Sequence, residues 1–332
     1  MRKIIAIISA AAMICSCAGK QQAANGLTDY VNPLLGTATL WETEDLGYER
    51  HQEKRTWGAE VFPGATLPNA MVQLTPVTMW RAGAGYQYED TTILGFAHTA
   101  MGHWNLIDLP IIPVTGYFNA DNYASGYSHD NESARPGYYQ VYLKRYGINA
   151  ELTATTHAGY HRYTFGENDP KRLLINVAHN QNPVGDWAID RAADKAFAGH
   201  QGGLYYYAVT SLPIDSIGIV TSKAEKGVPV AVVDFKGNTG SEPLEVKVGV
   251  SYVSIDNAKA NLEAEMLGKD FDQVKKQADD NWEQLLSKVK VEGGTERQKG
   301  LLYTTLYRAS LMPRLESDVN GQYRDNRGEI VT

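Results

Sequence analysis

The chain has 332 residues, of which 43% are hydrophobic and 21% are charged, and its formal net charge is −7. This composition is typical of a globular protein and excludes a disordered or collagen-like chain. The acidic excess, without clusters of Lys and Arg, argues against a nucleic-acid partner. At this length we expect about two domains or one large one.

The N-terminal residues have the pattern of a lipoprotein signal. Arg2 and Lys3 precede an apolar run over 4–14 that is too short to span a bilayer. The run ends in Ile-Cys-Ser-Cys, which resembles the bacterial lipobox. We therefore expect a signal peptide over 1–16, a lipid on Cys17 and a tether over 17–27; a plain secretory signal is the alternative. Attachment through the lipid anchor alone predicts an envelope lipoprotein of a Gram-negative bacterium, on the periplasmic side or the outer surface.

Cysteine usage limits the chemistry of the processed chain. Cys15 and Cys17 are the two cysteines in the sequence. The first would leave with the signal peptide, and the second would carry the lipid. Cysteine catalysis, a cysteine-ligated zinc and a disulfide are therefore excluded for the processed chain.

Residues 28–254 have the pattern of a β domain. Ile148, Ala150, Leu152 and Ala154 alternate with polar residues, and the stretch 244–252 repeats this period of two. Further strands are expected over 160–165, 173–177, 204–210 and 228–235. Many short strands without helices between them predict a large antiparallel β-sandwich. No phosphate-binding glycine motif is present in the sequence.

The pattern becomes helical after the sandwich. We expect a helical linker over 255–292, with helices over 257–267 and 270–288. Thr295 is the predicted N-cap of a third helix over 296–312. Apolar residues lie almost all round this helix, so we expect it to be buried on several sides. Either another chain covers it, or the sequence is the front part of something longer.

Eleven segments along the chain together resemble a known family. They are YVNPLLGT (30–37), VFPGATLP (61–68), MVQLTP (71–76), GYQY (85–88), GFAHT (95–99), ARPGYY (134–139), AELTAT (150–155), VSYVS (250–254), GGTE (293–296), YTTLYR (303–308) and DVNG (318–321). In this order they resemble glycoside hydrolase family 92, the calcium-dependent exo-α-mannosidases.

The resemblance implies an N-terminal sandwich, a helical linker and a C-terminal (α/α)6 barrel. Residues 293–332 would be the start of a truncated barrel. The family's general acid, general base and Ca²⁺ ligands would lie outside this sequence, so we expect no catalytic residue and no metal ligand in this chain. The complete enzyme would invert the sugar configuration in a single displacement, with Ca²⁺ as its cofactor.

The stretch 78–108 is the candidate for loops that reach the sugar, and four of its residues are candidate substrate contacts. Trp80 would stack on mannose or pack at the domain boundary, and His98 would bind sugar hydroxyls or be a satisfied interface histidine. His103 and Trp104 lie where the sequence departs from the usual family loop. Asn69-Ala70, a little earlier, departs from the usual Phe-Gly pair.

Two alternatives to a sugar site are weak. His98 and His103 are five residues apart and His157 and His161 are four apart, so zinc is conceivable, but no HExxH motif is present. Glu89 and Asp90 are adjacent, so on a strand their side chains would point to opposite faces and could not act as a pair. A solvated acidic turn is the favoured interpretation.

The interpretation is therefore an exo-acting α-mannosidase, of which this chain is the N-terminal portion. It would remove mannose from N-glycans or mannans, and this portion alone would be inactive. Its expected partners are a mannose-containing glycan and its own missing barrel, or a separate chain that supplies the barrel. The alternative is a stand-alone carbohydrate-binding lipoprotein module or pseudoenzyme, which the apolar helix over 296–312 disfavours.

Overall fold

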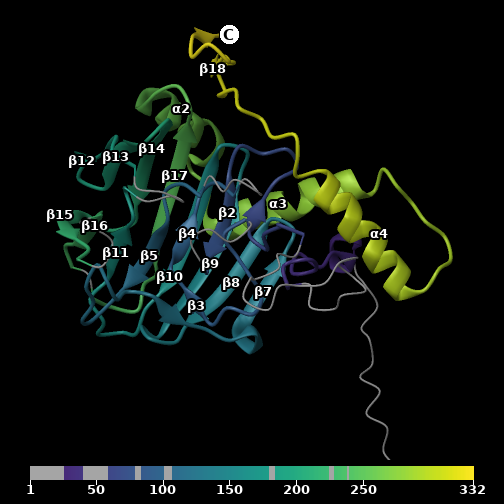
Figure 1. Cartoon of the computed structure of the whole chain (residues 1–332), viewed down its shortest axis with the longest axis horizontal. Helices are drawn as coiled ribbons and strands as arrows, with labels where there is room; N and C mark the ends of the chain where they lie inside the picture. The colour runs from purple at the N-terminus through teal and green to yellow at the C-terminus, as the bar shows by residue number, and fades with distance from the viewer. Residues whose placement is uncertain are drawn as a thin grey trace, which may run out of the picture.

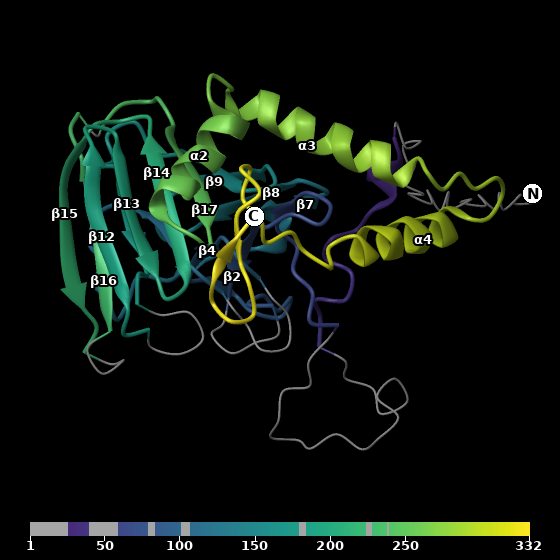
Figure 2. The ribbon, with the colours of Figure 1, turned by 90° about the horizontal axis from the view of Figure 1, so that it is seen from above.

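The computed structural model describes residues 26–39, 59–78, 84–100, 107–178, 184–223, 228–237 and 239–332. Two antiparallel sheets face each other and form a sandwich, with three helices beside it (Figures 1 and 2). The mainly β architecture predicted from the sequence is confirmed.

The strands are arranged in two large sheets and two small ones. The first large sheet has the order β1 (Ala65–Thr66), β2 (Gln73–Val77), β4 (Gly95–Ala97), β5 (Ile111–Val114), β11 (Arg172–Ile175), β16 (Pro229–Phe235) and β15 (Ile214–Thr221). The second has the order β12 (Trp187–Ala193), β13 (Ala196–Gln201), β14 (Leu204–Thr210), β17 (Leu244–Ser251), β10 (Ala158–Thr164), β9 (Ile148–Ala154), β8 (Tyr138–Leu143) and β7 (Glu132–Arg135). The small sheets pair β3 (Thr92–Ile93) with β6 (Ser125–Gly126) and β18 (Tyr323–Arg324) with β19 (Ile330–Val331). Two 3-10 helices are η1 (Leu27–Tyr30) and η2 (His129–Asn131).

The hydrophobic core lies between the two large sheets. Alternate residues of β17, from Leu244 through Val246 and Val248 to Val250, are 0% exposed and belong to one cluster with residues of the opposite sheet. Glu245 and Lys247 lie between them and are only partly buried. Removal of this apolar surface from water is the main force that holds the sheets together.

Helices α2 (Ile255–Met266) and α3 (Phe271–Leu286) cover the outer face of the eight-stranded sheet (Figure 2). Ser254 caps α2, and Asp270 caps α3 with a reciprocal capping box. Close packing of α2 on β17 depends on Gly249, because a Cβ there would lie 2.2 Å from the carbonyl oxygen of Ala258.

Helix α4 (Glu296–Ala309) begins as predicted, with Thr295 as its N-cap. Its Tyr307 packs on Trp282 of α3 at 4.5 Å between ring centroids. Among the described residues, α4 is covered on one face, and Leu301 on the opposite face is 59% exposed. The cause is that the packing partners of α4, which are η1 and α3, lie on one side of it. The expected burial on several sides is thus not met within this part of the chain, and cover from another chain or from a longer sequence stays a prediction.

In the ranges described above, no helix is both long and apolar enough to cross a bilayer.

Candidate functional site

Residues 310–325, here called the C-terminal segment, run from α4 across the sandwich to α2 (Figure 1). Asn69 fixes the start of this path. Its backbone N–H donates to the Ser310 carbonyl and its carbonyl accepts from Leu315 N–H, both at 2.8 Å. Its side-chain amide donates to the Pro313 carbonyl at 2.6 Å. Asn69 has a φ of 54°, a left-handed conformation that asparagine tolerates. The residue at which the sequence departs from Phe-Gly therefore holds the C-terminal segment.

Asp318 anchors the far end of the C-terminal segment. The whole residue is 4% exposed. Its carboxylate accepts hydrogen bonds from Ser251 Oγ, Asn257 Nδ2 and Asn261 Nδ2, each at 2.7 Å. Hydrogen bonds to a charged acceptor are about twice as strong as neutral ones. The carboxylate thus joins the segment to both β17 and α2.

A buried ion pair lies beside this anchor. His157 Nδ1 lies 2.6 Å from Glu265 Oε1, and its Nε2 lies 2.9 Å from the carbonyl oxygen of Ser317. Because both ring nitrogens face acceptors, the imidazolium form is satisfied. Burial opposes the charge on His157, but the hydrogen bond to Glu265 and its charge prevail, so the pKa of His157 is raised. Burial likewise opposes the charge on Glu265, and the bonds from His157 keep its pKa below the usual value.

The contact between the C-terminal segment and the sandwich is here called the seam. It contains a buried pair, Arg314 and Tyr252, with polar atoms that lack partners. The Arg314 side chain is 5% exposed, and its guanidinium lies 5.1 Å from the centre of the Tyr252 ring. One nitrogen pairs with Glu316 at 3.2 Å, whereas Nε and Nη1 have no hydrogen-bond partner among the described residues. Within the described part of the chain, the buried Tyr252 hydroxyl lies near Arg314 but makes no hydrogen bond of normal geometry. Burial raises the pKa of Tyr252 to about 12, against the opposing charge of Arg314.

Buried donors without acceptors are costly, at roughly 1–3 kcal/mol each, so each one in a native structure requires an explanation. A guanidinium with two free donors beside a phenol is suited to sugar hydroxyls or to a carboxylate. We therefore treat Arg314, Tyr252 and the pair Thr99 and Asp108, here called the loop stem, as the candidate site.

Within the loop stem, Thr99 and Asp108 bind each other. Thr99 Oγ1 donates to the Asp108 carboxylate at 2.9 Å, and Asp108 N–H donates back to Thr99 Oγ1 at 2.8 Å. Asp108 also acts electrostatically on Tyr252. Thr99 and Asp108 are thus held together by two hydrogen bonds.

Three of the four predicted sugar contacts, Trp80, His103 and Trp104, lie outside the described residues, as does Cys17. The fourth, His98, is 0% exposed. Its Nδ1 lies 2.9 Å from the Leu109 carbonyl oxygen, and its Nε2 lies 3.1 Å from Nε2 of His161. This environment is that of a satisfied interior histidine, so a direct sugar contact of His98 remains a prediction.

His98 belongs to a buried chain of three side chains. Tyr163 Oη lies 2.7 Å from Nδ1 of His161, whose Nε2 faces His98. If the phenol donates to His161 and His161 donates to His98, then His98 Nδ1 donates to Leu109 and every polar atom is satisfied with both rings neutral. Burial supports this neutral state: it lowers the pKa of His98 to about 4, and it lowers the pKa of His161 well below the usual value.

The four-residue spacing of His157 and His161 therefore has no joint role, because one ring binds Glu265 and the other binds His98. The adjacent carboxylates at 89 and 90 also separate: Glu89 accepts from Thr39 N–H and Asp90 accepts from Thr78 Oγ1, both at 2.7 Å. The two residues lie at a turn rather than on a strand, with Asp90 N–H donating to the Gln87 carbonyl, which agrees with the turn that the sequence favours.

Calcium is implied by the family resemblance, but the described part of the chain does not fit it. Within that part, no group of three His, Cys, Asp or Glu residues could hold a metal ion. The buried carboxylates of the seam accept instead from protein donors. We derive no step through a metal.

Sequence reasoning missed Arg314, Tyr252, Glu265 and Asp318. Tyr252 and Asp318 lie within two of the family-like segments and could have been selected from them. For Arg314 and Glu265 the sequence carries no signal, because their partners lie far away in the chain.

Family models match nearly the whole chain. The glycosyl hydrolase family 92 N-terminal domain matches residues 30–251, and the glycosyl hydrolase family 92 catalytic domain matches residues 257–332. The chain belongs to glycosyl hydrolase family 92. The match to the catalytic-domain family begins at residue 257, within α2.

Solved structures of this family resemble the chain closely. A family 92 alpha-mannosidase of Bacteroides thetaiotaomicron is 28% identical with a TM-score of 0.80, over 94% of this chain and 44% of that one. The structure of its complex with mannoimidazole has the same identity and TM-score, over 92% of this chain and 43% of that one. An uncharacterized secreted glycosidase of Arthroderma benhamiae is 23% identical over 86% of this chain and 41% of its own length. The chain thus spans less than half the length of these relatives.

Proposed function

We propose that this chain is the N-terminal portion of an exo-acting α-mannosidase that removes terminal mannose from N-glycans or mannans. The observation that carries the proposal is the 28% identity and the TM-score of 0.80 to a family 92 alpha-mannosidase, a neighbour also known in complex with mannoimidazole. The substrate class, single-step inversion and the need for Ca²⁺ follow from family resemblance and are part of the proposal.

In this proposal the seam borders the sugar pocket. The free donors of Arg314 and the hydroxyl of Tyr252 would bind hydroxyls of the glycan directly or hold the loop that does so. The loop stem at Thr99 and Asp108 would present His103 and Trp104 to the sugar, and Trp80 would stack on it. An indole over the apolar face of a pyranose is a common arrangement in sugar sites.

The uncovered face of α4 supports a barrel-forming role for residues 293–332. Leu301 of α4 is 59% exposed, and Met312, which follows the end of the helix, is 53% exposed, although both are apolar. Further helices of an (α/α)6 barrel, in the same chain or in a separate one, would cover them. On this proposal the catalytic acid and base belong to that barrel, so the 332-residue chain alone hydrolyses nothing.

The localisation proposal rests on the sequence alone. We propose that the chain is exported and lipidated at Cys17, in keeping with the relative described as a secreted glycosidase. Mass spectrometry of the native N-terminal peptide tests this: an acylated Cys17 is expected, and an unmodified peptide that begins elsewhere would contradict it.

The catalytic proposal is tested on the whole gene product, purified from its source cells with an antibody against the sandwich. We expect it to release free mannose from yeast mannan and high-mannose N-glycans, to lose activity in a calcium chelator, and to form the β-anomer first. Failure to release mannose from any α-mannoside would contradict the mannosidase assignment, and an α-anomer would contradict inversion.

The seam is tested in the same product with Arg314→Met, and Arg314→Lys serves as the control that keeps the charge. The methionine variant should raise KM by at least about tenfold, because it removes two charged donors. An unchanged KM in a folded Arg314→Met variant would exclude a role of this residue at the pocket.

A further inference from the structure

The two large sheets have four edge strands, and three of them carry the protection that natural sheets commonly use. An unpaired edge offers free N–H and C=O groups to another chain, and a short strand or charged side chains prevent such pairing. Strand β1 has only two residues, β7 carries Glu132 and Arg135, and β12 carries Asp190 and Arg191. The fourth edge strand is β15.

Strand β15 lacks this protection. Its residues 216–221 are Ser-Ile-Gly-Ile-Val-Thr, without a charged residue or a proline. Ile219 is 47% exposed and Val220 is 38% exposed. A Cβ added at Gly218 would have no atom of the described residues within 4 Å. The strand lies at the end of the sandwich away from α4 (Figure 2). An apolar, uncovered edge of this kind is a template for pairing with another strand.

The hydrogen-bond ladder indicates which backbone groups of β15 are available. Ser222 N–H donates to the Val228 carbonyl at 3.0 Å, in register with the ladder between β15 and β16. Hydrogen-bonded and non-hydrogen-bonded pairs alternate in an antiparallel ladder. Alternate residues from 216 to 220 therefore bond to β16 as well. The backbone groups that point away from β16 are those of Ile217, Ile219 and Thr221.

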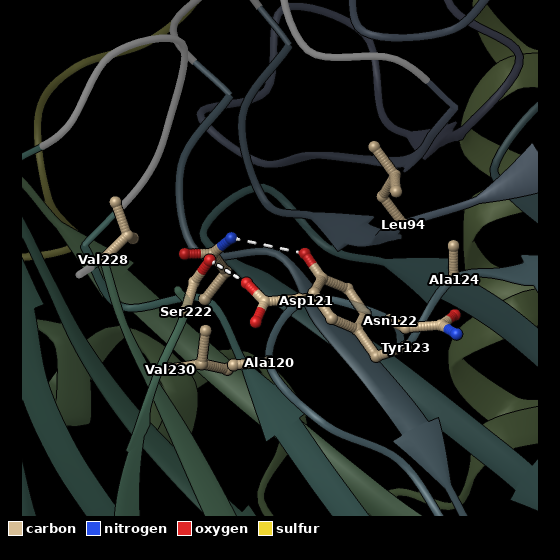
Figure 3. A pocket seen from close by; sticks show the side chains of 10 residues that line it. Leu94, Ala120, Asp121, Asn122, Tyr123, Ala124, Ser222, Val228 and Val230 are labelled. Carbon is tan, nitrogen blue, oxygen red and sulfur yellow. Dashed lines mark hydrogen bonds between the residues drawn. The ribbon is translucent and has the colours of Figure 1, made fainter. Parts of the chain in front are cut away.

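This free edge is limited at both ends. At the start of β15, Ile214 N–H also points outward, and it donates to the Asp194 carbonyl at 2.8 Å. Just beyond the other end, Ser222 Oγ donates to the Asp121 carboxylate and holds the chain there (Figure 3). The segment with available backbone groups is therefore short and defined.

Two charges lie at equal distances from the middle of the free edge. Asp215 is four positions before Ile219 and Lys223 is four positions after it, and both are exposed. In an antiparallel pair of two β15 strands with Ile219 facing Ile219, Asp215 of each copy faces Lys223 of the other. Opposite charges that face each other stabilise such a pair. In the same register, residue 217 faces residue 221, so all the available backbone groups bond across the pair.

We propose that β15 pairs with β15 of a second copy of this chain, around a twofold axis beside Ile219. The pairing joins the seven-stranded sheets of the two copies into one continuous sheet. A closed pair uses the free edge of both copies, so assembly stops at the dimer. The interface lies at the opposite end of the molecule from α4 (Figure 2), and the proposal does not rest on the mannosidase proposal.

The test is the mass of the 332-residue chain in solution, measured by sedimentation velocity over a series of concentrations. We expect a reversible dimer with about twice the 36.6 kDa of one chain. Ile219→Lys places two like charges opposite each other at the axis and should raise the dissociation constant at least about tenfold. Leu301→Lys changes the exposed face of α4 and is the matched control, which should dimerise normally.

Two further measurements address the register of the pair. Asp215→Lys should weaken the dimer, and the double variant with Lys223→Asp should restore it, because the facing charges are then opposite again. Hydrogen exchange resolved to single amides should slow at residues 217, 219 and 221 as the protein concentration rises. It should stay unchanged at 218 and 220, which bond to β16 in either state. If Ile219→Lys does not fold, Asp215→Lys decides.

Several results would overturn the proposal. They are a monomer at all concentrations up to about 100 μM, which would leave the edge to a different partner, or open-ended assemblies larger than a dimer. A dimer that Leu301→Lys abolishes and Ile219→Lys does not, or a charge exchange that restores nothing, would also contradict it. Mannose release by the whole gene product should be unchanged in Ile219→Lys, so failure of this proposal and failure of the mannosidase proposal are distinguishable.

Discussion

The buried chain of His98, His161 and Tyr163 makes the protein sensitive to acid. Burial lowers the pKa of His98 from 6.5 to about 4, so the unfolded chain binds a proton there well before the native state does. The contribution of His98 to the free energy of unfolding is therefore complete above pH 6.5 and is lost as the pH falls towards 4. At about 1.4 kcal/mol per pH unit, the loss is roughly 3 kcal/mol. The lowered pKa of His161 adds a loss in the same direction.

The perturbation that isolates this effect is His98→Gln. A glutamine carbonyl can accept from His161 in place of the imidazole, but it does not titrate. We expect the variant to be less stable than the wild type at neutral pH, with a shallower decline in acid. The difference in slope should be about 1.4 kcal/mol per pH unit over the window from 6.5 to 4, which corresponds to one proton.

The assay is urea unfolding, followed by tryptophan fluorescence, of both proteins at a series of pH values through this window. Carboxylates and the His157–Glu265 pair titrate in both proteins, so their contributions cancel in the difference. Parallel stability curves for the two proteins would refute the reasoning, because they would mean that His98 takes up its proton equally well in the native state.

Three substitutions test, by the same unfolding assay, how the C-terminal segment and α3 pack on the sandwich. Asp318→Asn should cost about 2–4 kcal/mol and expose the chain after residue 310 to proteases, because one of three buried donors would face an amide N–H; unchanged protease resistance would argue against the anchor. Trp282→Phe removes a 2.7 Å hydrogen bond to a buried carbonyl and should cost about 1–3 kcal/mol, and a neutral result would mean that water replaces it. Gly137→Ala should cost at least about 1 kcal/mol, because φ is +74° and the new Cβ would lie 2.6 Å from that of Ala278. Gly185→Ala, with no atom within 4 Å, is the control, and equal effects at the two glycines would contradict the clash.

Local patterns predicted the elements of the fold well, because their causes are local. The period-two alternation of β9 and β17 and the N-cap Thr295 are confirmed with small changes at the ends. Helix α4 ends at Ala309 rather than at Met312. Pro313 follows, and the residue before a proline avoids the helical conformation.

Contacts between distant residues could not be predicted in this way. His98 and His161 lie 63 positions apart and meet only because β4 and β10 belong to facing sheets. Periodicity assigns a residue to a face but does not say which residue lies opposite in the other sheet. The same limit hid the contact of Arg314 with Tyr252, since neither residue carries a motif that points to the other.

The most direct test of the account compares mannose release from yeast mannan by two purified proteins, the 332-residue chain and the whole gene product from its source cells. The account predicts release by the whole product and none by the chain alone. A folded 332-residue chain that releases mannose, or a whole product that matches the chain in size and releases none, would contradict the assignment of this sequence as the non-catalytic front of an α-mannosidase.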